Sequence, residues 1–278
     1  MRHLAIALAL TLAATAAFAH DSAEDCSDKH FRFGKARAFV KQETIDAGSL
    51  RSLKLSVKNA PISVEGGASA YSITVCKAAE VEADLSAIRV VLEGNELKTY
   101  GPDRDDDRNW TVTYHVRVPR GADLDLSAKN GPLSIHDVDG KVMARLHNGP
   151  LALRNVGGNV DAETQNGPIS ISGGSGTIKA SASNGPLSVN LAGGSFNGTL
   201  DASTKNGPLT VKLPRDYSSG VVVESKGRGP ISCRAEGCAQ FLRNHDDDSD
   251  EPRRIELGSG PVNVRLSTVN GPVTVKDE

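Results

Sequence analysis

The sequence predicts an all-β protein: a parallel β-solenoid, similar to a β-helix, preceded by an N-terminal, partly antiparallel β region. Three observations support this class. The tripeptide Asn-Gly-Pro recurs along the chain, each time followed by a short alternation of aliphatic and small residues. The copies recur at nearly constant intervals, which is typical of solenoids built from stacked units. Glycine is abundant, at 28 of 278 residues, and no long stretch keeps a helical period.

The recurring tripeptide is expected to turn the chain in every unit. Glycine readily adopts positive φ angles and asparagine tolerates them, so the pair reverses the chain tightly. Proline fixes φ and lacks an N–H donor, which suits the residue that precedes a strand. The first four copies are evenly spaced and the fifth follows after a slightly longer interval, so we expect their asparagine side chains to stack and hydrogen-bond. The turn residues are Asn130, Gly131, Asn148, Gly149, Asn166, Gly167, Asn184, Gly185, Asn206 and Gly207.

Each unit divides into two amphipathic strands. After the turn, triplets such as Leu133-Ser134-Ile135 place aliphatic residues on one face and a small residue on the other. The second half, which includes Val142 and Ala144, also has a period of two, with an alanine at the same place in successive units. We therefore expect rungs of about 18–22 residues around a thin interior, and caps at both ends of the array.

The chain is expected to be exported. A short basic start is followed by an apolar run from Leu4 to Ala17 and by Ala17-Phe18-Ala19, which is typical of a cleaved signal peptide. No later stretch approaches the roughly 20 apolar residues of a membrane span. The periplasm is the expected location, with the cell surface and secretion as alternatives. The expected parts are a signal peptide (1–19), a polar segment (20–45), an N-terminal β region or cap (46–122) and the solenoid (123–278), with an insertion at about 234–256.

Four cysteines in an exported chain indicate disulfide bonds, although three pairings are possible. We favour Cys233–Cys238 and Cys26–Cys76. The alternative is a zinc site, but a single Cys-x4-Cys spacing without nearby histidines in phase is a poor match to known zinc ligand sets. No cofactor is predicted.

The repeated turns "NGPLSI", "NGPLSV" and "NGPLTV", separated by strands of the type "GxVxAxT" behind a signal peptide, resemble bacterial DUF4097 proteins. These are described as adhesin-like proteins of β-strand repeats. The resemblance covers roughly Leu50 to Val275 and is densest from Lys129 to Leu213. It implies a β-solenoid in an envelope or surface protein, and it assigns no catalytic residues.

The composition argues against several classes of partner. The net charge is −2 and no basic stripe is present, so nucleic acid is not an expected partner. The outward positions of the first strands form a small, neutral stripe without an acid–base pair. This stripe consists of Ser134, Ala152, Ser170, Ser188, Thr210, Ser232, Asn263 and Thr274.

A polysaccharide-acting β-helix enzyme remains an alternative, because such enzymes place carboxylates together on one outward face. Asp161 and Glu163 are the local acidic cluster of the repeats. His136 and His147 are outward-phase candidates on strands expected to be adjacent.

A weak calcium site is a third possibility. Asp246, Asp248 and Asp250 could supply oxygen ligands, although their spacing does not match an EF-hand. These residues lie in the insertion at about 234–256, and insertions in solenoids often carry binding function. The insertion is therefore the preferred interaction site, and the expected working surface is this insertion, the small, neutral stripe, or both.

Together these features predict a non-enzymatic, exported scaffold or interaction module, adhesin-like in character. Its partner is expected to be a protein or glycan of the envelope or cell surface. The alternatives are the polysaccharide-acting enzyme and a calcium-responsive binding protein.

Overall fold

The computed structural model describes residues 26, 31–48, 50–103, 109–191, 193–227, 229–239 and 253–277. Strands contain 64% of the described residues and helices 3%, which confirms the predicted all-β class. Within these residues, no helix has the length and apolar character needed to cross a membrane. The predicted signal peptide lies outside this description.

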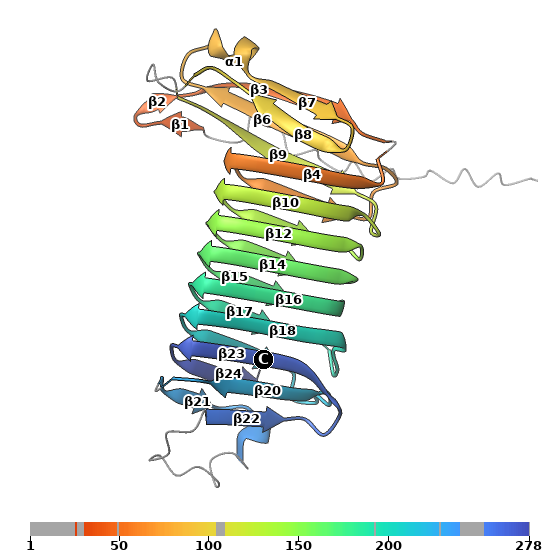
Figure 1. Ribbon diagram of the computed structural model, residues 1–278, viewed down its shortest axis with the longest axis vertical. Helices are drawn as coiled ribbons and strands as arrows, with labels where there is room; N and C mark the ends of the chain where they lie inside the picture. The colour runs from red at the N-terminus through yellow and green to blue at the C-terminus, as the bar shows by residue number, and fades with distance from the viewer. Residues whose placement is uncertain are drawn as a thin grey trace, which may run out of the picture.

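Two open sheets of 11 strands each, sheet I and sheet II, lie against each other along the long axis of the molecule (Figure 1). At each Asn-Gly-Pro turn the chain crosses from a strand of sheet I to a shorter strand of sheet II, and the two strands form one layer. Equivalent strands pair in parallel one repeat apart, with Val142 opposite Val160 and Leu151 opposite Ile169. Both sheets are mixed, because antiparallel pairs occur near their ends.

The stack is the part of the molecule in which these layers repeat. Every sheet I strand of the stack ends at the asparagine of a turn, so the motif marks the same edge in each layer. The sheet I strands are β4 (Ser52–Asn59), β10 (Asp123–Asn130), β12 (Lys141–Asn148), β14 (Asn159–Asn166), β16 (Ser175–Asn184), β18 (Asn197–Asn206) and β23 (Val262–Asn270). The sheet II strands are β5 (Ile62–Gly66), β11 (Leu133–His136), β13 (Leu151–Arg154), β15 (Ile169–Ser172), β17 (Leu187–Asn190), β19 (Leu209–Leu213) and β24 (Val273–Asp277).

The interior between the sheets is apolar and continuous from layer to layer. In β12 the side chains of Val142 and Ala144 are fully buried. In β13 Leu151 and Leu153 are each 1% exposed. A buried threonine replaces an aliphatic residue at the end of some sheet I strands. The hydroxyl of Thr204 donates to the carbonyl oxygen of Gly185 at 2.8 Å, so this polar group is not left unpaired inside the core.

The asparagine side chains of the turns form a hydrogen-bonded ladder along one edge of the stack. In each step the Nδ2 amide donates to the Oδ1 of the asparagine in the neighbouring layer, at 2.5–2.9 Å. An internal asparagine therefore both donates and accepts. The ladder follows the layers rather than the sequence, because its last step joins Asn270 to Asn206. Its members are Asn59, Asn130, Asn148, Asn166, Asn184, Asn206 and Asn270.

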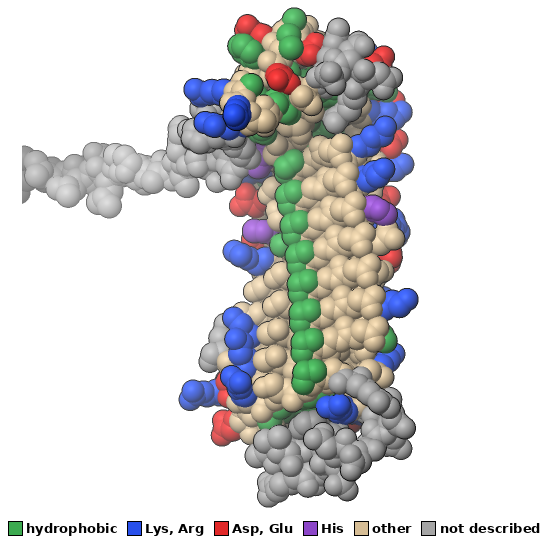
Figure 2. Space-filling model, turned by 90° about the vertical axis from the view of Figure 1, so that its left-hand side faces the viewer, with side chains coloured by type: hydrophobic (Ala, Val, Ile, Leu, Met, Phe, Trp, Pro, Cys, Tyr) green, Lys and Arg blue, Asp and Glu red, His purple; other side chains and the backbone are tan. Residues whose placement is uncertain are grey.

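Every ladder asparagine except Asn59, which precedes Ala60, is followed by a glycine, and this glycine is required because successive turns lie very close together. The N–H of Gly167 donates to the carbonyl oxygen of Asn184 at 2.9 Å. A Cβ atom added to Gly167 would lie 2.0 Å from the carbonyl oxygen of Gly149, far inside contact distance. The prolines that come next are exposed, and Figure 2 shows a continuous apolar column along this side of the molecule. The exposed prolines of the stack are Pro132, Pro150, Pro168, Pro186, Pro208 and Pro272.

The N-terminal cap consists of a segment that precedes the first layer and of a second segment inserted between the first and second layers, whereas the sequence predicts a β region that precedes the solenoid. β4 and β5 pair in parallel with β10 and β11, so the stack begins at Ser52 and not near residue 123. Beyond this layer, β9, β6 and β3 extend sheet II, and β8 and β7 extend sheet I. The cap elements are β1 (Arg32–Phe33), β2 (Ala36–Arg37), β3 (Phe39–Asp46), β6 (Ser72–Ala79), α1 (Asp84–Ala87), β7 (Arg89–Glu93), β8 (Glu96–Tyr100) and β9 (Trp110–Val118).

At the C-terminal end the order of layers departs from the order of the sequence. β20 (Gly220–Ser225) and β21 (Ile231–Cys233) follow β19 in the chain, but they do not pair with β18 and β19. β23 and β24 occupy that place instead and lie between the two earlier layers (Figure 1). β22 (Arg253–Leu257) then pairs antiparallel with the outer side of β20. The layer formed by β23 and β24 is therefore inserted between two layers that precede it in the sequence.

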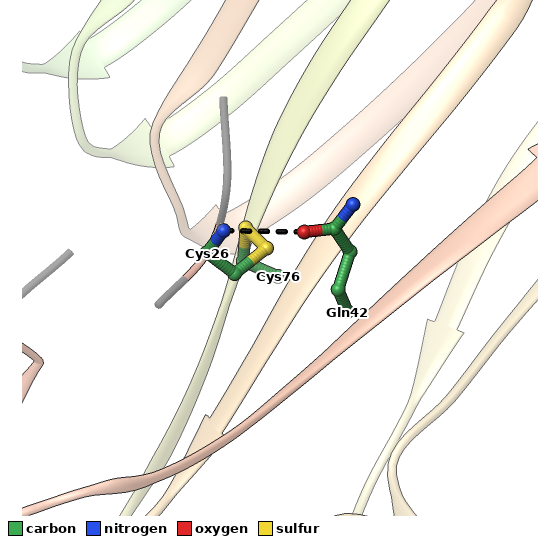
Figure 3. The surroundings of a disulfide bond; sticks show 3 residues. All are labelled: Cys26, Gln42 and Cys76. Atoms are coloured by element: carbon green, nitrogen blue, oxygen red, sulfur yellow. Dashed lines mark hydrogen bonds between the residues drawn. A yellow bond between two sulfur atoms is a disulfide. The ribbon is translucent and has the colours of Figure 1, made fainter. Parts of the chain in front are cut away.

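Two disulfide bonds connect the pairs that the sequence favours. Cys26 is bonded to Cys76 of β6, with 5.6 Å between their Cα atoms (Figure 3). The N–H of Cys26 also donates to Oε1 of Gln42 in β3 at 3.1 Å. Cys233, the last residue of β21, is bonded to Cys238 in a 3₁₀ helix (Glu236–Ala239). The first bond thus attaches Cys26 to the cap, and the second closes a short loop at the opposite end of the stack.

Replacing a turn glycine should strongly destabilise the stack. We expect Gly167→Ala to lower the free energy of unfolding by about 3 kcal/mol or more, because the new methyl group overlaps the neighbouring turn. Gly121→Ala is the matched control, since a Cβ at this position would meet nothing within 4 Å. Denaturant unfolding of both variants measures the difference. Equal stability of the two would contradict the role given to the close approach.

The position of an asparagine within the ladder should determine the effect of removing its side chain. Asn166→Ala breaks two side-chain hydrogen bonds and should cost about 1–2 kcal/mol. Asn59→Ala breaks the one bond donated by Asn130 and should cost about half as much. Thermal and denaturant unfolding of both variants provide the measurement. A larger loss for Asn59→Ala would show that the ladder does not act as described.

Candidate functional site

A groove of about 1090 Å³ lies where the N-terminal cap meets the outer face of sheet I. One side is formed by the end of β4 and its turn, from Ser56 to Ala60, and another by the cap around Trp110. The floor is formed by outward side chains near the ends of β10, β12, β14 and β16. The groove thus exists because the cap overhangs an otherwise regular face.

Trp110, the first residue of β9, provides the aromatic wall of the groove. Its indole Nε1–H donates to the carbonyl oxygen of Pro102 at 3.0 Å. A Cβ atom on Gly101 would lie 2.4 Å from the indole ring, so the chain passes directly over the ring at this glycine. The side chain is half-buried. The hydrogen bond and this packing hold the ring in one orientation, with part of its surface available to a ligand.

Tyr114 lies deeper in the same wall and is 1% exposed. Its hydroxyl is hydrogen-bonded to the hydroxyl of Thr99 in β8. Burial raises the pKa of Tyr114 to about 12, and the bond to Thr99 lowers it by a smaller amount. The inner part of the groove is therefore neutral at physiological pH.

The floor of the groove carries cationic and titratable side chains at regular intervals. Lys58, Lys129 and His147 each precede the ladder asparagine of their strand, so they occupy equivalent places in three adjacent layers. Neighbouring strands of a sheet are about 4.8 Å apart, which sets the spacing of this column. Within the described part of the chain, neither lysine has an ion-pair partner. The column therefore presents positive charge to the groove, which the carboxylates of Asp103 and Glu163 also line.

A second column of the floor contains charges of both signs. Arg145 of β12 lies beside Glu163 of β14 in the register of sheet I. Arg145 also forms an ion pair with Asp125, with 3.7 Å between the guanidinium nitrogen and the carboxylate oxygen. Exposed pairs of this kind contribute little to stability, so these side chains remain able to exchange partners with a ligand.

The structure separates the two candidate histidines and places only one of the two candidate carboxylates at the groove. Glu163 lines the groove, but Asp161 does not, and it lies opposite Lys179 in the next strand. His147 lies in sheet I at the groove, whereas His136 is in sheet II. The prediction that the two histidines stand on adjacent strands is therefore wrong, because the chain changes sheet at every turn.

The predicted stripe of small, neutral residues, called the small-polar stripe below, is continuous on the outer face of sheet II, but one of its predicted members lies elsewhere. Ser134, Ala152 and Ser170 lie opposite one another in adjacent strands, and the same register continues to Thr274. Asn263 does not belong to this stripe, because Pro261 leads into β23 of sheet I and not into a sheet II strand.

The calcium candidates Asp246, Asp248 and Asp250 lie outside the described residues, as does most of the insertion at about 234–256. Among the residues that are described, no group of three or more His, Cys, Asp or Glu side chains could hold a metal ion.

Sequence reasoning missed the groove and the lysines that line it. Lys58, Lys129 and His147 form what we call the lysine column. A signal for it was present in the sequence, because a cationic or titratable residue precedes each of three successive ladder asparagines. The wall could not be found in the same way, since Trp110 reaches the stack only through the pairing of β9 with β5.

The fold and the groove define an all-β protein with a stack of parallel layers and a lateral groove. No family model matches the chain, and no curated protein matches its sequence. The DUF4097 assignment thus stays a resemblance of the repeats.

Several solved structures show distant similarity. A proposed adhesin from Bacteroides fragilis is 10% identical over 86% of this chain and 97% of its own, with a TM-score of 0.33. A proposed cell adhesion protein from Clostridium sporogenes is 10% identical over 87% and 100%, with a TM-score of 0.28. A proposed lipid-binding protein from Parabacteroides distasonis is 14% identical over 86% and 96%, with a TM-score of 0.29.

Titration of Tyr114 should make the protein less stable at alkaline pH. Its pKa is about 12 in the folded chain against 10.0 for an ordinary tyrosine, so the unfolded chain ionises first. The stabilising contribution is complete below pH 10 and is lost as the pH rises to 12, by on the order of 2 kcal/mol. Tyr114→Phe should reduce this loss, although Tyr71 and Tyr217, whose pKa values burial also raises, retain part of it. Unfolding measured from pH 8 to 12 tests this, and an unchanged slope in the variant would contradict it.

Proposed function

We propose that this protein is an exported, non-enzymatic β-solenoid that acts as a binding module in the cell envelope, with the groove as its binding site. The observation that supports this most directly is the groove itself. It combines a fixed aromatic wall, a neutral inner surface and a floor of exposed charged side chains. Concave sites with a few convergent polar groups beside apolar surface are the usual form of ligand-binding sites.

The arrangement of carboxylates favours binding over catalysis. Glycoside hydrolysis requires two carboxyl groups on opposite sides of the bond that breaks, one of them commonly in apolar surroundings. Glu163 and Asp161 both lie exposed on the surface of one strand, two residues apart. Asp103, the other described carboxylate of the groove, is also exposed. None of these groups has the buried environment typical of a general acid.

Several features support export and an envelope location. Disulfide bonds form and persist in oxidising compartments, and both pairs of cysteines are bonded. The parallel layers, paired in a constant register, agree with the solenoid implied by the DUF4097 resemblance. A periplasmic module of this shape would hold its groove on a rigid support.

In-cell photocrosslinking from two surfaces tests the proposed site. A photoreactive residue replaces Ser183 in the groove, and another replaces Ser188, which lies outside the groove on the outer face of sheet II. We expect specific adducts from position 183 and none from position 188, because only the first of these two positions lines the groove. The two positions belong to the same layer, so differences in folding or expression are controlled.

Two results would contradict the proposal. Adducts from position 188 alone would move the binding function to the small-polar stripe. Absence of adducts from both positions, in cells that export the folded protein, would indicate a scaffold without a ligand.

A further inference from the structure

We propose that the ligand of the groove is an acidic oligosaccharide, a chain of sugar rings that carry carboxylates. This inference rests on the proposed function, because it names the ligand class of the same groove. It is drawn from the charge of the floor, the nature of the wall and the limited apolar surface between them.

The lysine column supplies the recognition of negative charge. Lys58 and Lys129 are exposed at the ends of neighbouring strands, and His147 continues the column in the third layer. Lysine ammonium groups bind carboxylates through charge-assisted hydrogen bonds. Because the column repeats with the strand spacing of about 4.8 Å, it matches a ligand whose charges also repeat along its length. A single small anion would use only one position of the column.

The wall supplies the recognition of sugar rings. The C–H groups on one face of a pyranose pack against the face of an aromatic ring, and Trp110 is half-buried and fixed in orientation. Hydroxyl groups need donors and acceptors close to this wall. Asn59 lies at the end of the ladder, and among the described residues its Nδ2 has no acceptor. Gln165 and Ser183 lie further along the floor.

The apolar part of the groove is too small for acyl chains. Most of its apolar residues are themselves covered: Val112 is 2% exposed, and Leu146 is 4% exposed. Trp110, Val57 and Pro102 are the half-buried apolar residues of the lining. A lipid bound here would leave its acyl chains exposed to water, which is unfavourable. A sugar chain is hydrophilic and has no such cost. The groove therefore fits an acidic glycan better than an anionic lipid.

Isothermal titration calorimetry with defined oligosaccharides tests this proposal on the mature protein. The probes are hexasaccharides of galacturonic and mannuronic acid, together with their methyl esters, which keep the rings and remove the charge. We expect binding of at least one acid and at least tenfold weaker binding of its ester. High salt should weaken binding of the acid, because exposed charges are screened.

Matched variants locate the interaction. Lys58→Ala combined with Lys129→Ala should weaken binding of the acid about tenfold or more, a typical effect for charge-assisted bonds. Lys205→Ala is the control, because Lys205 precedes Asn206 in the same position of β18 but lies outside the groove. Trp110→Leu should weaken binding of acid and ester alike. The melting temperatures of the lysine variants should stay unchanged, since both side chains are exposed.

The contrary outcomes separate this inference from the proposed function. Equal binding of acid and ester, or no effect of the double lysine variant, would overturn the acidic ligand while the groove stays the binding site. Binding of phosphatidylglycerol vesicles without binding of either acid would replace the glycan by a lipid headgroup. No binding of any probe, together with no crosslinks from position 183, would overturn both proposals.

Discussion

The fold depends on the close parallel stacking of backbone at the turns. Each turn donates an N–H to the next, and the space between them admits no side chain at the glycine position. This contact fixes the register of both sheets at once, because every turn joins a strand of sheet I to a strand of sheet II. The asparagine ladder and the apolar interior follow from that register. A shift of one residue in any layer would turn its aliphatic side chains outward.

The regular part of the molecule was predictable because its determinants are local. Period-two alternation, the Asn-Gly-Pro turn and the constant spacing can all be read within one repeat and its neighbour. Each of them constrains the backbone directly. The all-β class follows from them, and so does the burial of Leu133 and Ile135. The two disulfide pairs are those favoured among the three pairings that four cysteines allow.

The ends of the stack and the groove were not predictable in the same way. β9 pairs with β5 across a long intervening segment that contains three other strands, and no local signal specifies that partner. β23 pairs with β18 although β20 comes earlier in the chain, so the order of strands along the sequence does not predict their order in the sheet. The groove combines both difficulties. Its floor belongs to the repeat, but its wall exists only because of a long-range pairing, so the site appears only once the topology is known.

The insertion of β23 and β24 between earlier layers has a consequence for how the chain folds during synthesis. The chain is synthesised from its N-terminus, so these strands become available last. Until they arrive, the layers on either side cannot meet, and the side chains of Val211 and Val223 lie at an unfinished seam. Completion of the stack therefore requires the whole chain. A chain that ends before Val262 would lack the strands that pair with β18 and β19 and would leave their backbone groups at an open edge.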